Sequence, residues 1–316
     1  MQKEVFSKLP KAVIFAADVG GTNTNIGLCS VKGNKVTLHA KFTFHSQKLS
    51  KFEDAIKQVL KESKFNISVA CIAAAGPVSA DRKTCKLTNV KWKIDVRKLP
   101  FKCLLLNDFE ALGYSVNVLQ PKDVKVVRKG SSNKQPIAIL GAGTGLGKSL
   151  LYCCNDIYIP QPSEGGHADL PMTADEEPLF NWFGNKVEYE DVLSGRGIAN
   201  LYRFFYWSWY HEMRKKDPAA IMKDKFHISK LTRDTFIQFY ARCAKNFALD
   251  GLTTGGVIIA GGIAAKNPHL FGKDFIKEFT KSKTQRHILE KIPIKVITNY
   301  DVSLLGAAFA ALHARV

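Results

Sequence analysis

The chain has 316 residues, of which 46% are hydrophobic and 23% are charged, a composition typical of a globular protein long enough for two lobes. Its N-terminal apolar run, "AVIFAA", is too short for a signal peptide and no other run approaches a membrane span, so we expect a cytoplasmic protein without a membrane partner. The net charge of +18 would suit nucleic acid, but the basic residues are spread along the chain without an aromatic-interleaved motif, so we expect a solvated basic surface and no nucleic-acid partner.

The first part of the chain predicts strands that alternate with helices. Residues 12–46 predict a meander of strands, and a helix with a capping box formed by Ser50 and Glu53 follows. "SVACIAAAGPV" and "KCLLLND" predict buried strands, the second ending at Asn107 and Asp108, and "FEALGYSVNVL" predicts the next helix. This alternation indicates an α/β protein with parallel central strands, in which ligands bind beyond the carboxyl ends of the strands.

The second part repeats this organisation. Helices are predicted at about 175–184, 190–215 and 233–249, followed by a buried strand in "GGVIIAGGIAA", a late strand in "IPIKVIT" and a terminal helix in "VSLLGAAFAALHA". The third of these helices carries a mainly aromatic stripe expected in the core, formed by Phe236, Phe239, Tyr240, Cys243 and Phe247. We expect a small α/β lobe from residues 1–110 and 302–316 and a large α/β lobe from residues 111–301.

The stretch "IAILGAGTGLGKSLLYCCN" contains a glycine loop that fits neither common phosphate-binding pattern. A P-loop needs glycine where Ala142 stands, and a dinucleotide-binding turn needs glycine at Leu146 or Lys148. The residues that follow predict a strand and not a helix. The loop is therefore a hairpin turn whose backbone amides could bind an anion, with an ordinary glycine-rich hairpin as the alternative.

A second hairpin of the same kind lies in "VIFAADVGGTNTNIGLCSV". Its strand ends in Asp18, and Gly20, Gly21 and Thr22 form the turn. Two such hairpins could hold a polyphosphate between two lobes, with Asp18 near the magnesium that a polyphosphate carries. The alternative for Asp18 is a turn aspartate that accepts hydrogen bonds from nearby backbone amides.

Polar side chains gather in "LLLNDF", "PSEGGHADL" and "YEDVLSG", which contribute Asn107, Asp108, Glu164, His167 and Glu190. A sugar requires such a set, because each hydroxyl must be met by a carboxylate, amide or imidazole once water is removed. Asp108 is the candidate base for a hydroxyl nucleophile, and its alternative is a helix N-cap. Without an H-E-x-x-H motif or a third ligand, we do not expect a metal at Glu164 and His167. The seven cysteines lack C-x-x-C spacing and predict reduced thiols.

Taken in order, "DVGGTN", "LLLNDFEALG", "IAILGAGTGLG", "SEGGHADL", "EDVLSGRGIANLY" and "GGVIIAGGIAAK" resemble the bacterial glucokinase family nearly from end to end. That family belongs to the sugar kinase and actin-like ATPase superfamily. The resemblance implies an α/β, two-lobed actin-like ATPase (ribonuclease H-like) fold with duplicated mixed sheets flanked by helices, and an active site in the cleft between the lobes.

The resemblance also implies an activity: ATP-dependent phosphorylation of D-glucose at the 6-hydroxyl, the first step of glycolysis, with Mg2+ arriving on ATP. It implies that Asp108 is the catalytic base and a homodimer is the assembly. The implied sugar-binding residues are Asn107, Asp108, Glu164, His167 and Glu190. The implied ATP-binding residues are Asp18, Gly20, Gly21, Thr22, Asn23, Gly143, Thr144, Gly145, Gly261 and Gly262, with Asp18 indirectly at the metal.

Two alternatives to glucose phosphorylation remain open in the sequence. One is a kinase for another hexose, such as mannose, glucosamine or an N-acetylated sugar, because the polar residues suit any similar pyranose. The other is a non-catalytic, sugar-responsive binding protein that uses the basic surface on nucleic acid. The presence of Asp108 argues against a sensor, and the lack of cysteine in "GGHADLPMTADEEP" argues against a zinc-containing relative. The high positive charge and "NTNIGLC" after the first loop depart from the family's commonest form.

Overall fold

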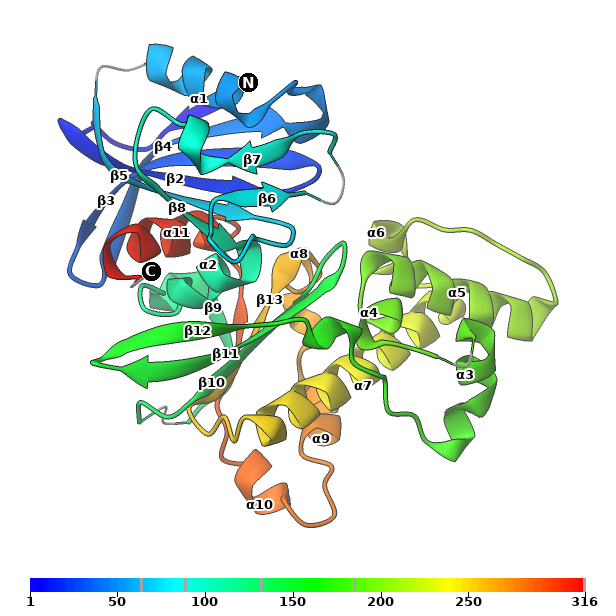
Figure 1. The fold of residues 1–316 in the computed structure, drawn as a ribbon. Coiled ribbons are helices and arrows are strands. Elements are labelled where there is room, and N and C mark those ends of the chain that lie inside the picture. The colour runs from blue at the N-terminus through cyan, green and yellow to red at the C-terminus, as the bar shows by residue number, and fades with distance from the viewer. Residues whose placement is uncertain (63–64, 88–89, 131–132, 185, 315–316) are drawn as a thin grey trace. The chain divides into compact units, whose positions relative to one another are not determined.

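A computed structural model describes residues 1–62, 65–87, 90–130, 133–184 and 186–314 (Figure 1). The chain forms two compact units. Unit 1 comprises Met1–Gln120, Cys154–Pro162 and Asp301–Val316, and unit 2 comprises Pro121–Cys153 and Ser163–Tyr300. Within the described ranges, no helix combines the length and the apolar character that crossing a bilayer requires.

Unit 1 is built on a mixed sheet. Its strands are Gln2–Val5 (β1), Ala12–Val19 (β2), Asn23–Lys32 (β3), Lys35–His45 (β4), Asn66–Ala74 (β5) and Cys103–Asn107 (β8). They are ordered β1-β4-β3-β2-β5-β8, and a separate small ribbon pairs Thr84–Lys86 (β6) with Lys93–Asp95 (β7). The meander β2-β3-β4 is antiparallel, whereas β5 and β8 add to β2 in parallel, so the meander and the parallel strands expected in this part of the chain are confirmed.

Alternation along β2 determines which side chains reach each face of this sheet. Val13, Phe15 and Ala17 pack with helix α1 (Phe52–Lys61) on one face. Ile14 and Ala16 pack with helices α2 (Asp108–Ser115) and α11 (Val302–His313) on the other face (Figure 1). Because side chains alternate along a strand, Asp18 belongs to the face of α2 and α11.

Helix α2 belongs to unit 1 because it packs closely on α11. A Cβ built at Gly306 of α11 would clash with the carbonyl oxygen of Ala111 of α2, so the two helix backbones approach as only glycine allows. Unit 1 therefore continues through Gln120, beyond the boundary at residue 110 that the pattern suggested.

The second sheet, which lies mainly in unit 2, repeats the plan of the first. Its strands are Val124–Arg128 (β9), Ile137–Ala142 (β10), Leu146–Cys154 (β11), Ile157–Ser163 (β12), Gly256–Ala260 (β13) and Ile294–Ile297 (β14). They are ordered β12-β11-β10-β13-β14-β9. The strands pair in the same way in both sheets. β10 pairs antiparallel with β11 and in parallel with β13, and β13 pairs in parallel with β14. These four strands, β10, β11, β13 and β14, therefore correspond to β2, β3, β5 and β8.

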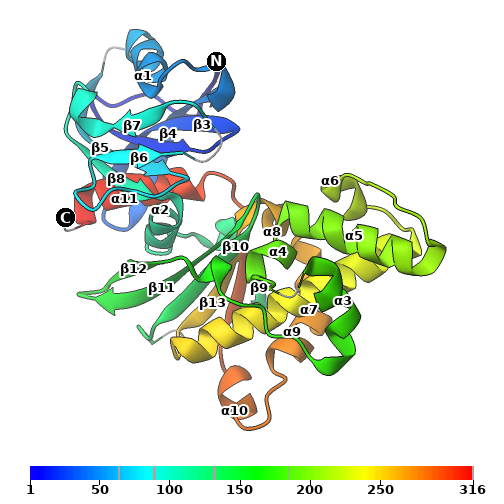
Figure 2. The ribbon, with the colours of Figure 1, turned by 45° about the vertical axis from the view of Figure 1, so that its right-hand side comes forward.

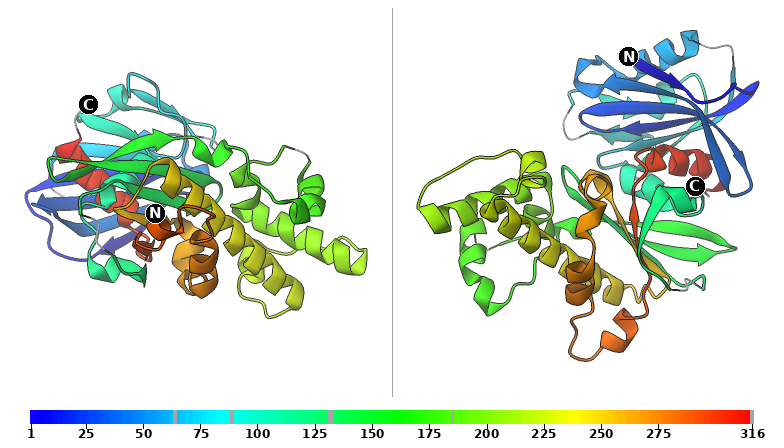
Figure 3. Two further views of the ribbon diagram at one scale, coloured as in Figure 1. Left: turned by 90° about the horizontal axis from the view of Figure 1, so that it is seen from below. Right: turned by 180° about the vertical axis from the view of Figure 1, so that it is seen from behind.

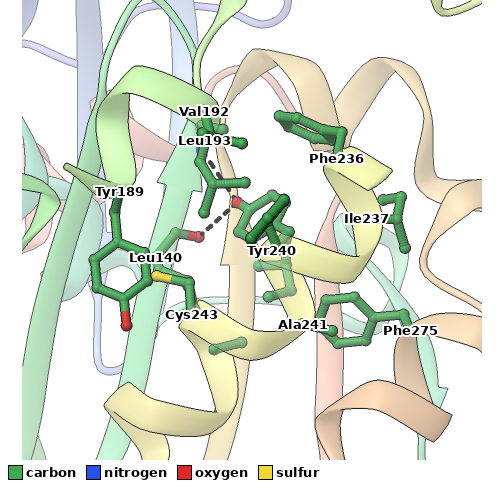
Figure 4. Packing of buried hydrophobic residues seen from close by; sticks show 14 of the residues in the cluster. Leu140, Tyr189, Val192, Leu193, Phe236, Ile237, Tyr240, Ala241, Cys243 and Phe275 are labelled. Atoms are coloured by element: carbon green, nitrogen blue, oxygen red, sulfur yellow. Dashed lines mark hydrogen bonds between the residues drawn. The ribbon is translucent and has the colours of Figure 1, made fainter. Parts of the chain in front are cut away.

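Helices cover the second sheet. They are Glu177–Phe183 (α3), Tyr189–Val192 (α4), Gly195–Tyr210 (α5), Pro218–Ile221 (α6), His227–Asp250 (α7), Gly261–Lys266 (α8), Lys273–Phe279 (α9) and Arg286–Leu289 (α10). Helices α5 and α7 pack against each other, as Figures 2 and 3 show. The long helix α7 buries the aromatic stripe that its sequence predicts, including Phe236 and Tyr240 (Figure 4).

Three local predictions were wrong. Ser50 and Glu53 form no capping box: α1 begins after Lys51 without a side-chain cap, and the Ser50 hydroxyl donates to Asp54 instead. The helix expected at 190–215 is divided into α4 and α5 at Ser194, whose hydroxyl caps α5 by accepting the Gly197 amide. Helix α7 begins at His227, six residues before the expected 233.

Candidate active site

The first glycine turn, between β2 and β3 in unit 1, is held by the serine that directly follows β4. The Ser46 hydroxyl donates to the carbonyl of Gly20 at 2.6 Å, and the Ser46 amide donates to the carbonyl of Thr22 at 2.9 Å. Across the turn, the Gly20 amide donates to the carbonyl of Asn23 at 2.9 Å. Ser46 is fully buried and was not predicted, because only the pairing of β3 with β4 brings it to the turn.

Asn107 and Asp108 lie where β8 passes into α2, the carboxyl end at which a ligand is expected. The N-cap is Asn107 and not Asp108: the Asn107 side chain accepts the Phe109 amide at 2.8 Å. Glu110 completes a capping box by accepting the Asn107 amide at 3.0 Å. Asp108, the first helical residue, is therefore not the N-cap, although its Oδ1 also accepts the Phe109 amide at 3.0 Å, and it is partly exposed.

Asp18 lies close enough to Asp108 for their charges to interact. Burial, together with the neighbouring Asp108 carboxylate, raises the pKa of Asp18 to about 7, and nearby Lys41 opposes this shift. Lys41 itself forms an ion pair with Asp301 at 2.6 Å. Unit 1 thus brings together the turn aspartate and the candidate base.

The second glycine turn, between β10 and β11 in unit 2, is held by the segment that carries Glu190. The Glu190 carboxylate accepts the Leu146 amide at 2.9 Å, and a Cβ at Gly145 would clash with that carboxylate. The Gly195 amide donates to the carbonyl of Gly143 at 2.9 Å. Glu190 therefore supports the turn directly, a contact that its predicted role at the sugar did not include.

The segment with Glu164 and His167 is exposed and lies beside further carboxylates. His167 Nδ1 lies 2.7 Å from Glu188 Oε2, and this hydrogen bond raises the pKa of His167, with smaller contributions from Glu190 and Glu164. Three of the predicted sugar-binding residues, Glu164, His167 and Glu190, therefore lie in one electrostatic neighbourhood of unit 2. Glu188 was missed, although it stands two residues before Glu190.

A buried lysine connects this segment to β11. Lys148 donates to the carbonyl of Gly165 at 3.2 Å, and its ammonium lies 4.9 Å and 4.4 Å from the ring centres of Tyr189 and Phe247. The aromatic faces stabilise this ammonium in a position where little water reaches it. In the sequence, Lys148 stands out only because it follows the glycine loop at the position where a P-loop has its lysine.

The turn with Gly261 and Gly262 lies beside the second glycine loop. Gly261 has φ +85°, a left-handed conformation that favours glycine, and its missing side chain leaves room for the carbonyl of Ala142 at the end of β10. The parallel pairing of β10 with β13 produces this approach, so two of the predicted ATP-binding segments lie side by side in unit 2.

Among the described residues, no group of three or more His, Cys, Asp or Glu side chains has the arrangement of a metal site. Glu164 and His167 therefore gain no third ligand there. All seven cysteines lie in the described ranges and are free thiols, as expected.

Comparison with known proteins identifies the family. The glucokinase family model matches residues 15–314. A glucokinase of Nostoc punctiforme is 33% identical over an alignment of 339 positions, which covers 95% of this chain and 98% of that protein. A glucokinase of Yersinia pestis is 33% identical over 308 residues, which cover 92% of this chain and 93% of that protein.

A solved structure agrees with the sequence relatives. The crystal structure of a glucokinase from an Antarctic psychrotroph matches with a TM-score of 0.82 and 26% identity, over 95% of this chain and 98% of that one. This match and the repeated sheets confirm the expected α/β fold of the actin-like ATPases, with duplicated mixed sheets flanked by helices. The chain belongs to the glucokinase family.

Proposed function

We propose that Asp108 is the base with which this glucokinase-family enzyme phosphorylates D-glucose. The reaction transfers the γ-phosphoryl group of ATP to the 6-hydroxyl, giving glucose 6-phosphate and ADP. As the oxygen of the 6-hydroxyl forms its bond to phosphorus, its proton passes to the Asp108 carboxylate, and the bond between the γ-phosphorus and the ADP oxygen breaks. A base of this kind contributes roughly 10²–10⁴-fold to the rate.

The observation that supports this role is the position of Asp108. It follows a buried strand, its neighbour Asn107 performs the capping, and its carboxylate lies near that of Asp18. A cation that accompanies ATP would offset the repulsion between these two carboxylates. We therefore propose Mg-ATP as the second substrate, with Asp18 near the metal through its water ligands.

The remaining predicted residues have complementary roles in this proposal. The amides of the turn with Gly20, Gly21, Thr22 and Asn23 and of the turn with Gly143, Thr144 and Gly145 bind phosphates, and Gly261 and Gly262 leave space for the nucleoside. Glucose hydroxyls are bound by Asn107, Glu164, His167 and Glu190. Because the Asn107 oxygen already accepts the Phe109 amide, Asn107 offers the sugar its NH2 group, which makes a long 3.4 Å contact with the carbonyl of Gly76.

Replacing the base tests the proposal. Asp108→Asn keeps the size of the side chain but cannot accept the proton, so we expect kcat to fall by about 10²-fold or more while glucose binding, measured by calorimetry, is largely retained. Near-normal turnover in the folded variant would show that Asp108 is not the base. ADP release measured across glucose, mannose, glucosamine and N-acetylated hexoses gives the sugar range.

We further propose a cytoplasmic homodimer, the assembly that the family resemblance implies. Sedimentation velocity at several protein concentrations distinguishes a dimer from a monomer. A single monomeric species at micromolar concentration, with full activity, would contradict the homodimer.

A further inference from the structure

We propose that Arg82 is a positioning residue for the turn formed by Asn107 and Asp108, and that it acts through Glu110. The inference rests on the proposed role of Asp108. Arg82 lies in the loop before β6, far from the turn in sequence, and does not belong to either glycine hairpin.

A shared carboxylate connects the guanidinium to the turn. Arg82 donates from Nη2 to Glu110 Oε1 at 2.9 Å and from Nη1 to Glu110 Oε2 at 3.2 Å. The same Oε2 accepts the backbone amide of Asn107 at 3.0 Å. The two parallel bonds leave the Glu110 carboxylate a single orientation, and that orientation is the one that holds the amide next to Asp108.

Burial makes Glu110 dependent on Arg82. The Glu110 side chain is only 7% exposed, whereas that of Arg82 is 31% exposed. An ionised carboxylate that loses its partner in such a place must take up a proton or turn towards water. Either change weakens its bond to the Asn107 amide, because a protonated oxygen is a poorer acceptor and a rotated one is out of reach. Loss of the capping box would then free the turn that carries the base.

The backbone at Arg82 is consistent with a functional constraint. Arg82 has φ +53°, a left-handed conformation that is uncommon for a residue with a side chain. A turn stabilises it: the Arg82 amide donates to the carbonyl of Ser79, and Asp81 accepts the amide of Lys83. This conformation directs the side chain at Glu110, and strained residues of this kind concentrate at functional sites.

The decisive experiment compares Arg82→Met with Arg97→Met under saturating glucose and ATP. Arg97 is a matched control because it also binds a carboxylate through two side-chain bonds, to Asp95 at 2.8 Å and 2.9 Å, and this pair lies in unit 1 at the end of β7 and not at the turn. We expect kcat of Arg82→Met to fall about 10–100-fold, since a displacement near 1 Å can cost about 10²-fold. We expect kcat of Arg97→Met to stay close to the parent value.

A double variant separates positioning from a general loss of stability. Arg82→Met with Glu110→Gln keeps an acceptor for the Asn107 amide but leaves no unpaired buried charge, so we expect it to recover at least about threefold in kcat over Arg82→Met alone. If the role of Arg82 were purely structural, Arg82→Met would lower the melting temperature and the folded fraction, but kcat per folded molecule would stay at the parent value. That result, or a double variant with no recovery, overturns the proposal.

Chemical rescue gives a second measurement where Arg82→Met folds poorly. Arg82 lines an open cavity of about 290 Å³, so guanidinium ion can reach the place that the Arg82 side chain leaves in Arg82→Ala. We expect millimolar guanidinium to raise kcat of Arg82→Ala and not of Arg97→Ala, and equal responses overturn the proposal. Asp108→Asn distinguishes the role of Asp108 as the base from the positioning role of Arg82. Normal turnover in Asp108→Asn refutes the role of Asp108 as the base. Normal turnover in Arg82→Met, when Asp108→Asn is inactive, refutes only the positioning role of Arg82.

Discussion

Tyr240→Phe should destabilise unit 2 by a measurable amount, because one hydroxyl lies beneath the second glycine turn. The Tyr240 hydroxyl accepts the Ala142 amide at 3.1 Å. It also donates to the carbonyl of Leu140 at 3.4 Å (Figure 4). All three residues are fully buried. Phenylalanine fills the same space but leaves the Ala142 amide without this acceptor, and an unsatisfied buried donor costs about 1–3 kcal/mol. The longer bond to Leu140 adds little.

Urea unfolding followed by tryptophan fluorescence measures this cost, with the transition of unit 2 identified by limited proteolysis. Tyr206→Phe is the control, because the Tyr206 hydroxyl accepts from Arg214, at 3.3 Å, and Arg214 can turn to water. We expect the free energy of unfolding to fall by about 1–3 kcal/mol in Tyr240→Phe and by less than about 0.5 kcal/mol in Tyr206→Phe. We also expect a higher KM for ATP in Tyr240→Phe, because Ala142 immediately precedes the turn. Equal costs in the two variants would refute the reasoning.

The second glycine turn and two titrating side chains lead to three more expectations. Gly145→Ala should destabilise the protein without ligands and raise KM for ATP, because the added Cβ would clash with Glu190. Gly143→Ala should leave thermal stability unchanged, since no described atom lies within 4 Å of a Cβ at Gly143. Native Asp18 keeps its proton up to about pH 7, whereas the unfolded chain releases it near pH 3.8, so the stability of the parent falls as the pH rises between these values. In urea titrations, Asp18→Asn should therefore be more stable than the parent at pH 8 and lose this advantage towards pH 4. The pKa of His167 is also raised, so its contribution to the free energy of unfolding should be complete below pH 6.5 and disappear above the raised pKa. His167→Gln should therefore flatten this part of the dependence of stability on pH.

Much of the fold could be predicted because its signals are local. The hairpins β2-β3 and β10-β11 show apolar strands interrupted by glycine, and the strand-forming residues after "GAGTGLG" are enough to distinguish this turn from a P-loop, which leads into a helix. The aromatic stripe of α7 was predicted from helical spacing for the same reason.

Helix caps show where local reasoning fails. The pattern of Ser50 and Glu53 and the pattern of Asn107 and Glu110 both fit a capping box, yet only the second forms one. Ser50 donates to Asp54 and α1 begins only after Lys51, whereas Glu110 is held in place by Arg82 from a distant part of the chain. A nearest-neighbour pattern does not contain that information. The N-x-x-E spacing in "NDFE" was nevertheless a readable signal that Asn107, and not Asp108, is the cap.

Several supporting residues could not be predicted at all, because strand pairing or packing brings them to the site. Ser46 reaches the first turn through β4, and Lys148 reaches the carbonyl of Gly165 from β11. Neither residue stands near the motif it supports in sequence, and neither has a side chain that by itself indicates a binding site. Their roles become visible only when the sheets are assembled.

The two repeated hairpins also differ at one equivalent position, and packing explains the difference. Asp18 occupies the second-last paired position of β2, and Gly141 occupies the second-last paired position of β10. Each faces the corresponding parallel strand, Asp18 opposite Ala73 and Gly141 opposite Ala260. In unit 2 a Cβ at Gly141 would lie 2.9 Å from the carbonyl carbon of Ala260, so no side chain fits where the turn of Gly261 approaches. A carboxylate can therefore stand at this position only in unit 1, whereas in unit 2 the same position must stay bare so that the backbone of Gly261 can approach.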